Sequence, residues 1–156
     1  SREIAFALIT DVSGDFCKKL RQRTGFDKDP RIRFVGTVYD KELLKKIREH
    51  AYGYFHGHEV GGTNPSLLEA LASTRLNLLL DVGFNREVAG GSALYWTKET
   101  GSLAALIDRA DGMSAEESEA LGSRARERIE KYYSWEYITD RYEQIFSKRS
   151  RTCVES

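Results

Sequence analysis

Short apolar runs alternate with segments of helical periodicity along most of the chain. The first run, residues 4–9, is nearly continuous, which is typical of a strand buried on both faces of a parallel sheet. Similar patterns predict the remaining strands, over residues 32–35, 52–56, 76–81 and 93–96. Helices are predicted over residues 14–23, 40–51, 63–74, 102–109, 114–131 and 135–147. Between the last two strands we expect a loop through Gly83 and Asn85.

Turn and capping residues mark the ends of several predicted helices. Gly25 is placed to end the first helix, and Asp40 is placed to cap the second. Pro65 falls in the first turn of the third helix, where proline is tolerated. Ser114 and Glu117 have the spacing of a capping box. These signals make the alternation of strands and helices more specific than hydrophobicity alone.

The alternation predicts an α/β domain over residues 1–148, built on a Rossmann-like, doubly wound parallel sheet, followed by a polar tail over residues 149–156 that we expect to be disordered. With 40% hydrophobic residues, a chain of 156 residues can bury one core. Such sheets bind ligands outside the carboxyl ends of their strands. Two loops at those ends contain glycine, Gly36-Thr37 and residues 56–64.

Composition excludes several classes of protein. The 24 basic residues balance 24 acidic ones, so the chain lacks the positive field with which proteins bind nucleic acid without sequence preference. Cys17 and Cys153 predict neither a disulfide framework nor a thiolate metal cage, and they fit a reducing cytoplasm. We expect neither a signal peptide nor a membrane span, because the first residues lack the pattern of a leader and no apolar run has the length of a span. Because the first apolar run begins at Ile4, we expect a soluble domain cut from a longer protein.

The most specific stretch is residues 58–72, where a predicted strand ends in glycines and a helix follows. Gly61 and Gly62 allow the backbone to approach a ligand closely, and Thr63 or Asn64 caps the helix. The free amides and the positive dipole end of that helix favour an anion, for which a diphosphate is the obvious candidate. The alternative interpretation is that the glycines serve only to turn the chain.

Glu69 lies one turn further along the same predicted helix. The core face of this helix carries Leu67, Ala70, Leu71 and Thr74. Glu69 points to the opposite side, where its carboxylate could accept two hydrogen bonds from a ribose diol. A glutamate on a solvated helix face is also common without any ligand, so both interpretations stay open from the spacing alone.

Residues 58–72 resemble the donor-site signature of family-4 glycosyltransferases of the GT-B fold, in which a glycine-bearing loop runs into a helix that reads roughly P-x-L-x-E-A-x-A. The resemblance extends to residues 34–38, 85–88 and 133–142, and it covers nearly the whole chain. It implies the carboxy-terminal half of a GT-B enzyme, in which loop amides meet the sugar-nucleotide diphosphate and Glu69 binds the ribose. The substrate-binding residues expected on these grounds are Gly36, Thr37, His58, Glu59, Gly61, Gly62, Thr63, Asn64, Ser66 and Glu69.

The chain departs from this family at one position. Gly61 stands where the family usually places a glutamate that contacts the donor sugar. Glu59 is one candidate to replace it, and the loop amides with Thr63 and Asn64 are another. The sequence of residues 61–70 resembles that of bacterial family members that attach rhamnose in capsule or cell-wall polysaccharides.

The resemblance also implies parts that these residues lack. One further strand, its basic loop and an amino-terminal acceptor domain would complete the enzyme. We therefore expect this chain to need that domain and a glycan acceptor as partners, to bind a nucleotide diphosphate sugar weakly, and to be inactive alone. The full-length protein is expected in the cytoplasm, peripheral at the inner face of the membrane. No catalytic residue is identified.

Other functions remain to be weighed against this one. A non-catalytic domain that binds a phosphorylated ligand, and one half of a nucleotide-sugar epimerase, fit the same fold. A dinucleotide oxidoreductase is disfavoured because no G-x-G-x-x-G opens the first helix. His50, His56 and His58 lack a recognised metal-ligand spacing, so neither a metal nor a cofactor is expected. His58 is instead a candidate hydrogen-bond donor to the sugar or phosphate.

Overall fold

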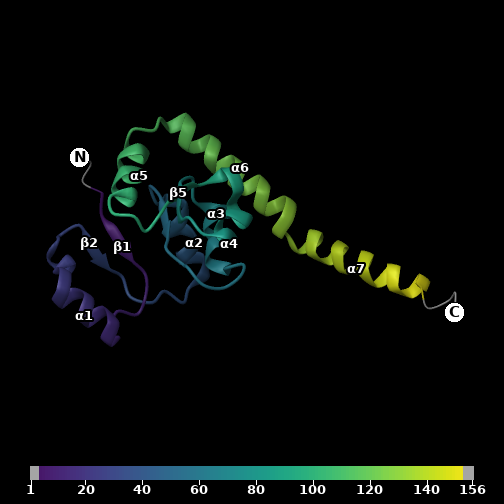
Figure 1. Ribbon diagram of the computed structural model, residues 1–156, viewed down its shortest axis with the longest axis horizontal. Helices are drawn as coiled ribbons and strands as arrows, with labels where there is room; N and C mark the ends of the chain where they lie inside the picture. The colour runs from purple at the N-terminus through teal and green to yellow at the C-terminus, as the bar shows by residue number, and fades with distance from the viewer. Residues whose placement is uncertain (1–3, 153–156) are drawn as a thin grey trace. The chain divides into compact units, whose positions relative to one another are not determined.

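The computed structural model describes residues 4–152 as alternating strands and helices (Figure 1). The strands within this range are β1 (Phe6–Leu8), β2 (Ile32–Phe34), β3 (Tyr54–His56), β4 (Asn77–Leu80) and β5 (Leu94–Trp96). The helices are α1 (Asp15–Thr24), α2 (Lys41–His50), α3 (Pro65–Ser73), α4 (Gly83–Ala89), α5 (Ser102–Asp111), α6 (Ala115–Tyr133) and α7 (Trp135–Thr152), with short 3₁₀ turns η1 (Phe26–Lys28) and η2 (Gly90–Ser92). All strand pairs among these residues are parallel, which confirms the predicted α/β class.

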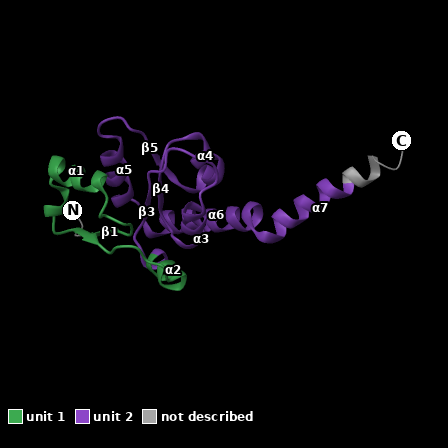
Figure 2. Cartoon of the chain, turned by 90° about the horizontal axis from the view of Figure 1, so that it is seen from below, with its two compact units in different colours: residues 1–47 green, residues 48–156 purple. Residues whose placement is uncertain are grey.

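The chain divides into two compact units, residues 1–47 and 48–156, coloured green and purple in Figure 2. The sequence analysis instead expected a single core. All buried hydrophobic side chains among the described residues belong to the second unit, from Leu67 onward. The core of the described chain is therefore a feature of the second unit.

The first unit contains a two-stranded parallel ladder. β1 pairs with β2 in the register Phe6↔Ile32, and α1 and η1 contribute no buried side chain. The prediction that the first strand is buried on both faces is wrong, because Phe6 is 38% exposed and Ala7 is exposed as well. Within this unit neither α1 nor η1 buries a side chain against the ladder, so the strand residues remain accessible to solvent. Phe34 nevertheless contacts two side chains of this unit. Its ring centroid lies 5.9 Å from that of Phe26, and the Arg21 guanidinium lies 4.5 Å from the same centroid.

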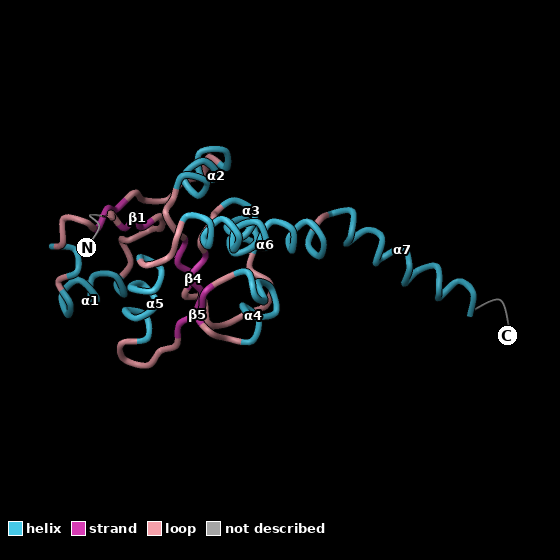
Figure 3. Tube along the Cα trace, turned by 90° about the horizontal axis from the view of Figure 1, so that it is seen from above, coloured by secondary structure: helices cyan, strands magenta, loops and turns pink. Residues whose placement is uncertain are grey.

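The second unit is built on the three-stranded sheet β3-β4-β5, with β4 in the middle and buried throughout. Consecutive residues of β4 point to opposite faces. Leu79 packs in a cluster with side chains of α3, α4 and α6, while Leu78 packs in a second cluster with side chains of α5 and α6. Figure 3 shows these helices around β4 and β5. Helices thus cover both faces of this sheet, as the doubly wound fold requires.

The prediction of a loop through Gly83 and Asn85 is wrong, because residues 83–89 form α4. Its start carries no side-chain cap, which removed the usual signal for a helix. The helix is held instead by burial, since Asn85, Val88 and Ala89 are all enclosed. Packing therefore decides the conformation of this segment.

The closing helix is longer than expected. α7 continues to Thr152, whereas the pattern predicted an end at residue 147. The rest of the predicted polar tail, residues 153–156, and the first three residues lie outside the described residues. Along the described part of α7, Trp135, Tyr142 and Phe146 are exposed. None of the helices in the described chain combines the length and apolarity needed to cross a lipid bilayer.

Candidate functional site

The start of α3 has the predicted construction. Asn64, and not Thr63, caps the helix, because its Oδ1 accepts a hydrogen bond from the Ser66 amide at 2.9 Å. Pro65 follows in the first turn, where its missing N–H costs nothing. The residues predicted to face the core, Leu67, Ala70, Leu71 and Thr74, are fully buried. The predicted core face of α3 and its predicted cap are therefore confirmed.

The helix-end amides are less available than the sequence suggests. The Ser66 amide is taken by the cap, and the amides of Leu67 and Leu68 donate to the Asn64 carbonyl at 3.0 and 3.1 Å. The prediction that free amides of the helix itself meet an anion is therefore wrong for these positions. Any main-chain donors to a ligand must come from the preceding loop, while the positive end of the helix dipole still faces that side.

The glycine loop between β3 and α3 is open. Gly61 has φ 122°, a conformation that favours glycine, and neither Gly61 nor Gly62 has a heavy atom within 4 Å of where a Cβ would sit. Thr63 beside them is exposed. The backbone here can be approached from solvent, as close binding of a ligand requires.

Glu69 lies on the non-core face of α3, as predicted, and its side chain is 54% exposed. Its Oε2 is 2.5 Å from Nη1 of Arg48, in the last turn of α2. The sequence analysis did not identify Arg48. The exposed side of the Glu69 carboxylate is open to a ligand, while its other side is bound to the protein.

Two histidines lie at the carboxyl end of β3. The His56 ring is buried and lies 5.8 Å from the ring of exposed His58. Burial, with a smaller contribution from His58, lowers the pKa of His56 below its ordinary value of 6.5. His56 Nε2 has no partner among the described residues. Throughout residues 4–152, as far as their side chains are described, no group of three or more His, Cys, Asp or Glu side chains is placed to hold a metal ion.

Glu59 is already engaged by the protein. Its carboxylate forms an ion pair with Lys98, in the loop that follows β5. Glu59 was one of two candidates to replace the missing sugar-binding glutamate. The ion pair links the loop that follows β3 to the loop that follows β5, so Glu59 has a structural role whether or not it contacts a sugar.

Asn85 is a second residue that the sequence analysis did not place at the site. Its fully buried amide Nδ2 donates to the carbonyl of Leu80 at 2.8 Å and to that of His58 at 3.3 Å. Next to it, Arg86 pairs with Asp81 and lies over Tyr95, 4.3 Å from the ring centroid. Hydrogen bonding to Arg86 lowers the pKa of Asp81 below its ordinary value. The end of β4 is thereby joined to the start of the glycine loop.

The expected site residues fall into two groups. The larger group belongs to the second unit and comprises His58, Glu59, Gly61, Gly62, Thr63, Asn64, Ser66 and Glu69, all within the loop and the first turns of α3. Gly36 and Thr37 belong to the first unit, directly after β2, and Gly36 has φ 81°. They stand in the position expected for a loop at a strand's carboxyl end.

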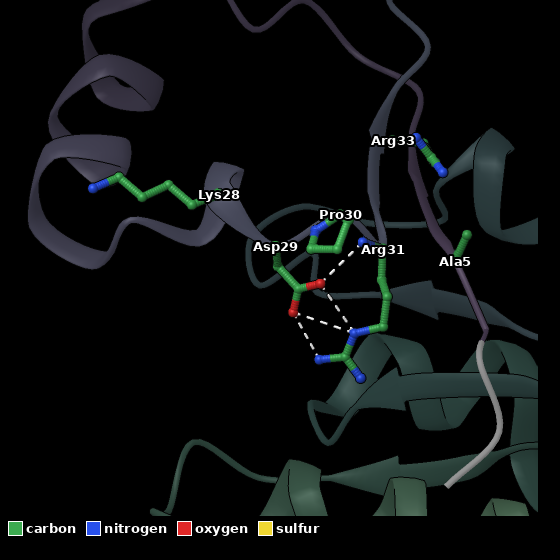
Figure 4. A pocket seen from close by; sticks show the side chains of 6 residues that line it. All are labelled: Ala5, Lys28, Asp29, Pro30, Arg31 and Arg33. Carbon is green, nitrogen blue, oxygen red and sulfur yellow. Dashed lines mark hydrogen bonds and ion pairs between the residues drawn. The ribbon is translucent and has the colours of Figure 1, made fainter.

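A cavity of about 790 Å³ lies in the first unit and is drawn in Figure 4. It is lined by Ala5, Lys28, Asp29, Pro30, Arg31 and Arg33, beside the amino ends of β1 and β2. The Arg31 guanidinium is already paired with Asp29 at 2.7 Å, and this hydrogen bonding lowers the pKa of Asp29 to about 2. Parallel sheets of this kind bind ligands at the opposite, carboxyl ends of their strands. The glycine loop is therefore the better candidate.

Comparison of the sequence with protein-family models and with curated proteins gives no match. Among solved structures, the chain is similar to sucrose-phosphate synthase from Thermosynechococcus elongatus, with a TM-score of 0.74 and 19% identity over 96% of this chain and 39% of that one. It is similar to the UDP-forming α,α-trehalose-phosphate synthase from Burkholderia vietnamiensis, with a TM-score of 0.75 and 15% identity over 97% of this chain and 37% of that one. It is also similar to HepE from Anabaena, solved in complex with UDP, with a TM-score of 0.73 and 17% identity over 93% of this chain and 41% of that one.

The chain therefore spans roughly two fifths of the length of each of these proteins. They are glycosyltransferases of the GT-B fold, a fold made of two Rossmann-like halves. The identities are low, so the likeness concerns the architecture. The architecture of this chain is that of one Rossmann-like half of the GT-B fold.

Proposed function

We propose that the chain is the donor-binding domain of a glycosyltransferase and holds a nucleoside diphosphate sugar. The observation that carries the proposal is the open glycine loop at the carboxyl end of β3, which leads into the capped start of α3. A diphosphate is the ligand chemistry that a helix amino end and exposed loop amides favour. The complex of HepE with UDP supports the same ligand class for a protein of this fold.

Each part of the donor has a proposed partner. The amides of residues 61–63 donate to the diphosphate, since those of the first helical turn are already bonded. Glu69 accepts from the ribose hydroxyls, and His58 donates to the sugar or the phosphate. Gly36 and Thr37, after β2, contact the nucleobase. These assignments rest on the resemblance of the sequence motifs together with the exposure of the loop.

The catalytic contribution of such a domain is electrostatic. Donors fixed around the diphosphate stabilise negative charge as it builds on the leaving group. Transfer further requires an acceptor held against the donor with water excluded, so a separate amino-terminal domain supplies the acceptor site and this chain alone is inactive.

The sequence of residues 61–70 supports a more specific proposal about the substrate. It resembles bacterial enzymes that attach rhamnose, so we propose transfer of rhamnose to a growing polysaccharide. The donors of such reactions are made inside the cell. A cytoplasmic location, peripheral at the inner face of the membrane in the full-length protein, follows from the same proposal.

Thermal shifts test the proposal directly. The panel contains UDP, dTDP, GDP, their glucose forms and dTDP-rhamnose. A bound nucleotide at ten times its dissociation constant adds about 1.4 kcal/mol, or roughly 3 to 6 °C in melting temperature. We expect a rise with one base that falls by more than half in Glu69→Ala and persists in Glu127→Ala, an exposed glutamate of α6. A full-length protein that responds to no member of the panel contradicts the proposal.

A further inference from the structure

Arg48 is a buried cation with an identified anionic partner. Its side chain is only 10% exposed, whereas that of Glu69, to which it is paired at 2.5 Å, is 54% exposed. A guanidinium stays charged at any physiological pH, and burying it is costly unless its charge is paired. The pair is therefore asymmetric, with a nearly fixed arginine holding a carboxylate that reaches solvent.

Further contacts hold Arg48 in place. Its guanidinium carbon lies 5.9 Å from the centroid of the Tyr54 ring on β3. Its main-chain carbonyl accepts a hydrogen bond from Thr74 Oγ1 at 3.1 Å, and Thr74 is the fully buried C-cap residue that follows α3. Arg48 thus contacts α3 both in its middle, through Glu69, and at its end, so its position relative to the helix is well determined.

This arrangement bears on what Glu69 can do. A glutamate on an exposed helix face normally samples several rotamers, and ordering it on binding costs entropy. An ion pair to a buried arginine selects one orientation in advance. We infer that Arg48 is a positioning residue, which holds the Glu69 carboxylate ready to accept hydrogen bonds from the sugar hydroxyls of a nucleotide.

The inference rests on the proposed function and makes it more specific. If Arg48 acts only through Glu69, its removal weakens recognition of the nucleotide's ribose hydroxyls and leaves the diphosphate contacts of the glycine loop intact. If Arg48 is merely structural, its removal disturbs α3 and weakens every nucleotide alike. The two roles are separated by ligands that lack the hydroxyls.

Calorimetric titration of the full-length protein makes this comparison. The probes are UDP against 2′,3′-dideoxyuridine diphosphate, and dTDP against 3′-deoxythymidine diphosphate. We expect the wild type to prefer the hydroxylated member of at least one pair roughly tenfold or more, as hydrogen bonds to a charged group allow. We expect Glu69→Ala to bring that preference below about twofold and Arg48→Met to reduce it severalfold, as the ordering cost of one side chain predicts, with affinity for the deoxy member unchanged within about twofold.

Two more variants keep the result interpretable. Arg48→Lys retains the charge but not the planar fork, so it is expected to restore the preference only partly. Arg126→Met removes the arginine of a more exposed pair, Arg126 with Glu119 at 2.6 Å, and is expected to behave as the wild type. If Arg48→Met does not fold, Arg48→Lys decides, and in it an undiminished preference overturns the inference.

The outcomes distinguish the two levels of the account. A wild type that binds none of the four nucleotides, and GDP no better, overturns the proposed function and the inference with it. A wild type that shows the preference, beside a folded Arg48→Met that shows it equally or loses both members of a pair to the same extent, overturns the inference alone.

Discussion

Asn85 Nδ2 lies 3.3 Å from the main-chain oxygen of His58, and it donates a second hydrogen bond to the carbonyl of Leu80 at 2.8 Å. One buried amide therefore ties the first residues of the glycine loop to the end of the central strand β4. The residues that we propose to contact the donor lie just after His58. Their geometry depends on this connection, which runs between segments 27 residues apart in the chain.

Asn85→Leu removes both hydrogen bonds while keeping a similar side-chain volume. The Leu80 carbonyl keeps the Val82 amide as a donor and the His58 carbonyl loses the Asn85 amide, so we expect the free energy of unfolding to fall by about 1 kcal/mol. Nucleotide affinity is expected to weaken as well, because the loop loses an anchor. Urea unfolding and calorimetric titration measure the two effects, with Glu87→Gln on the exposed side of α4 as the control. An Asn85→Leu protein with unchanged stability and affinity refutes the anchoring role.

Gly61 and Gly62 form a matched pair for testing the loop. Both positions have open space, but only Gly61 has a positive φ, at 122°. Gly61→Ala must either strain the backbone, at about 1–3 kcal/mol, or change the loop's path. We expect it to weaken nucleotide binding clearly more than Gly62→Ala does. Titration of the two variants with the same nucleotide checks this, and equal affinities would show that the backbone conformation at Gly61 is not needed.

His56 predicts a dependence of stability on pH. Burial lowers its pKa in the folded protein below 6.5, so the unfolded chain takes up the proton first as the pH falls. Stability is then fully present above the ordinary pKa and declines as the pH falls from about 7 toward the lowered value, by at most about 1.4 kcal/mol per pH unit. His56→Phe should show a smaller loss between pH 7.5 and 5.5 in urea unfolding. An identical loss in both proteins assigns the pH dependence to other groups.

Local signals carried much of the prediction from sequence. The core face of α3 and the cap at its start follow from residues within a few positions of each other, and the structure confirms both. The strand positions and the parallel α/β class were likewise correct. These features depend on periodicity and capping, which a single sequence displays.

The features that were missed depend on distant partners. Arg48 follows Leu44 by four residues and therefore lies on the same face of the helix. A charge on an apolar helix face needs a partner. That partner, Glu69, is 21 residues away in the sequence and could not be identified from it. Asn85 was taken for a turn residue because its acceptors, His58 and Leu80, cannot be identified from its neighbours. Without such contacts, neither the ion pair nor α4 could be derived.

The most direct test of the central claim is to record which backbone amides respond to a nucleotide. In a two-dimensional ¹⁵N–¹H NMR titration of this chain with UDP, dTDP and GDP, we predict that the largest shifts fall on residues 58–64 and on Ser66, and that they are smaller at the same nucleotide concentration in the Gly61→Ala protein. The method also detects the weak binding expected of one domain alone. Shifts confined to the cavity beside Lys28 and Arg33, or no shifts at all, would contradict a donor site at the glycine loop.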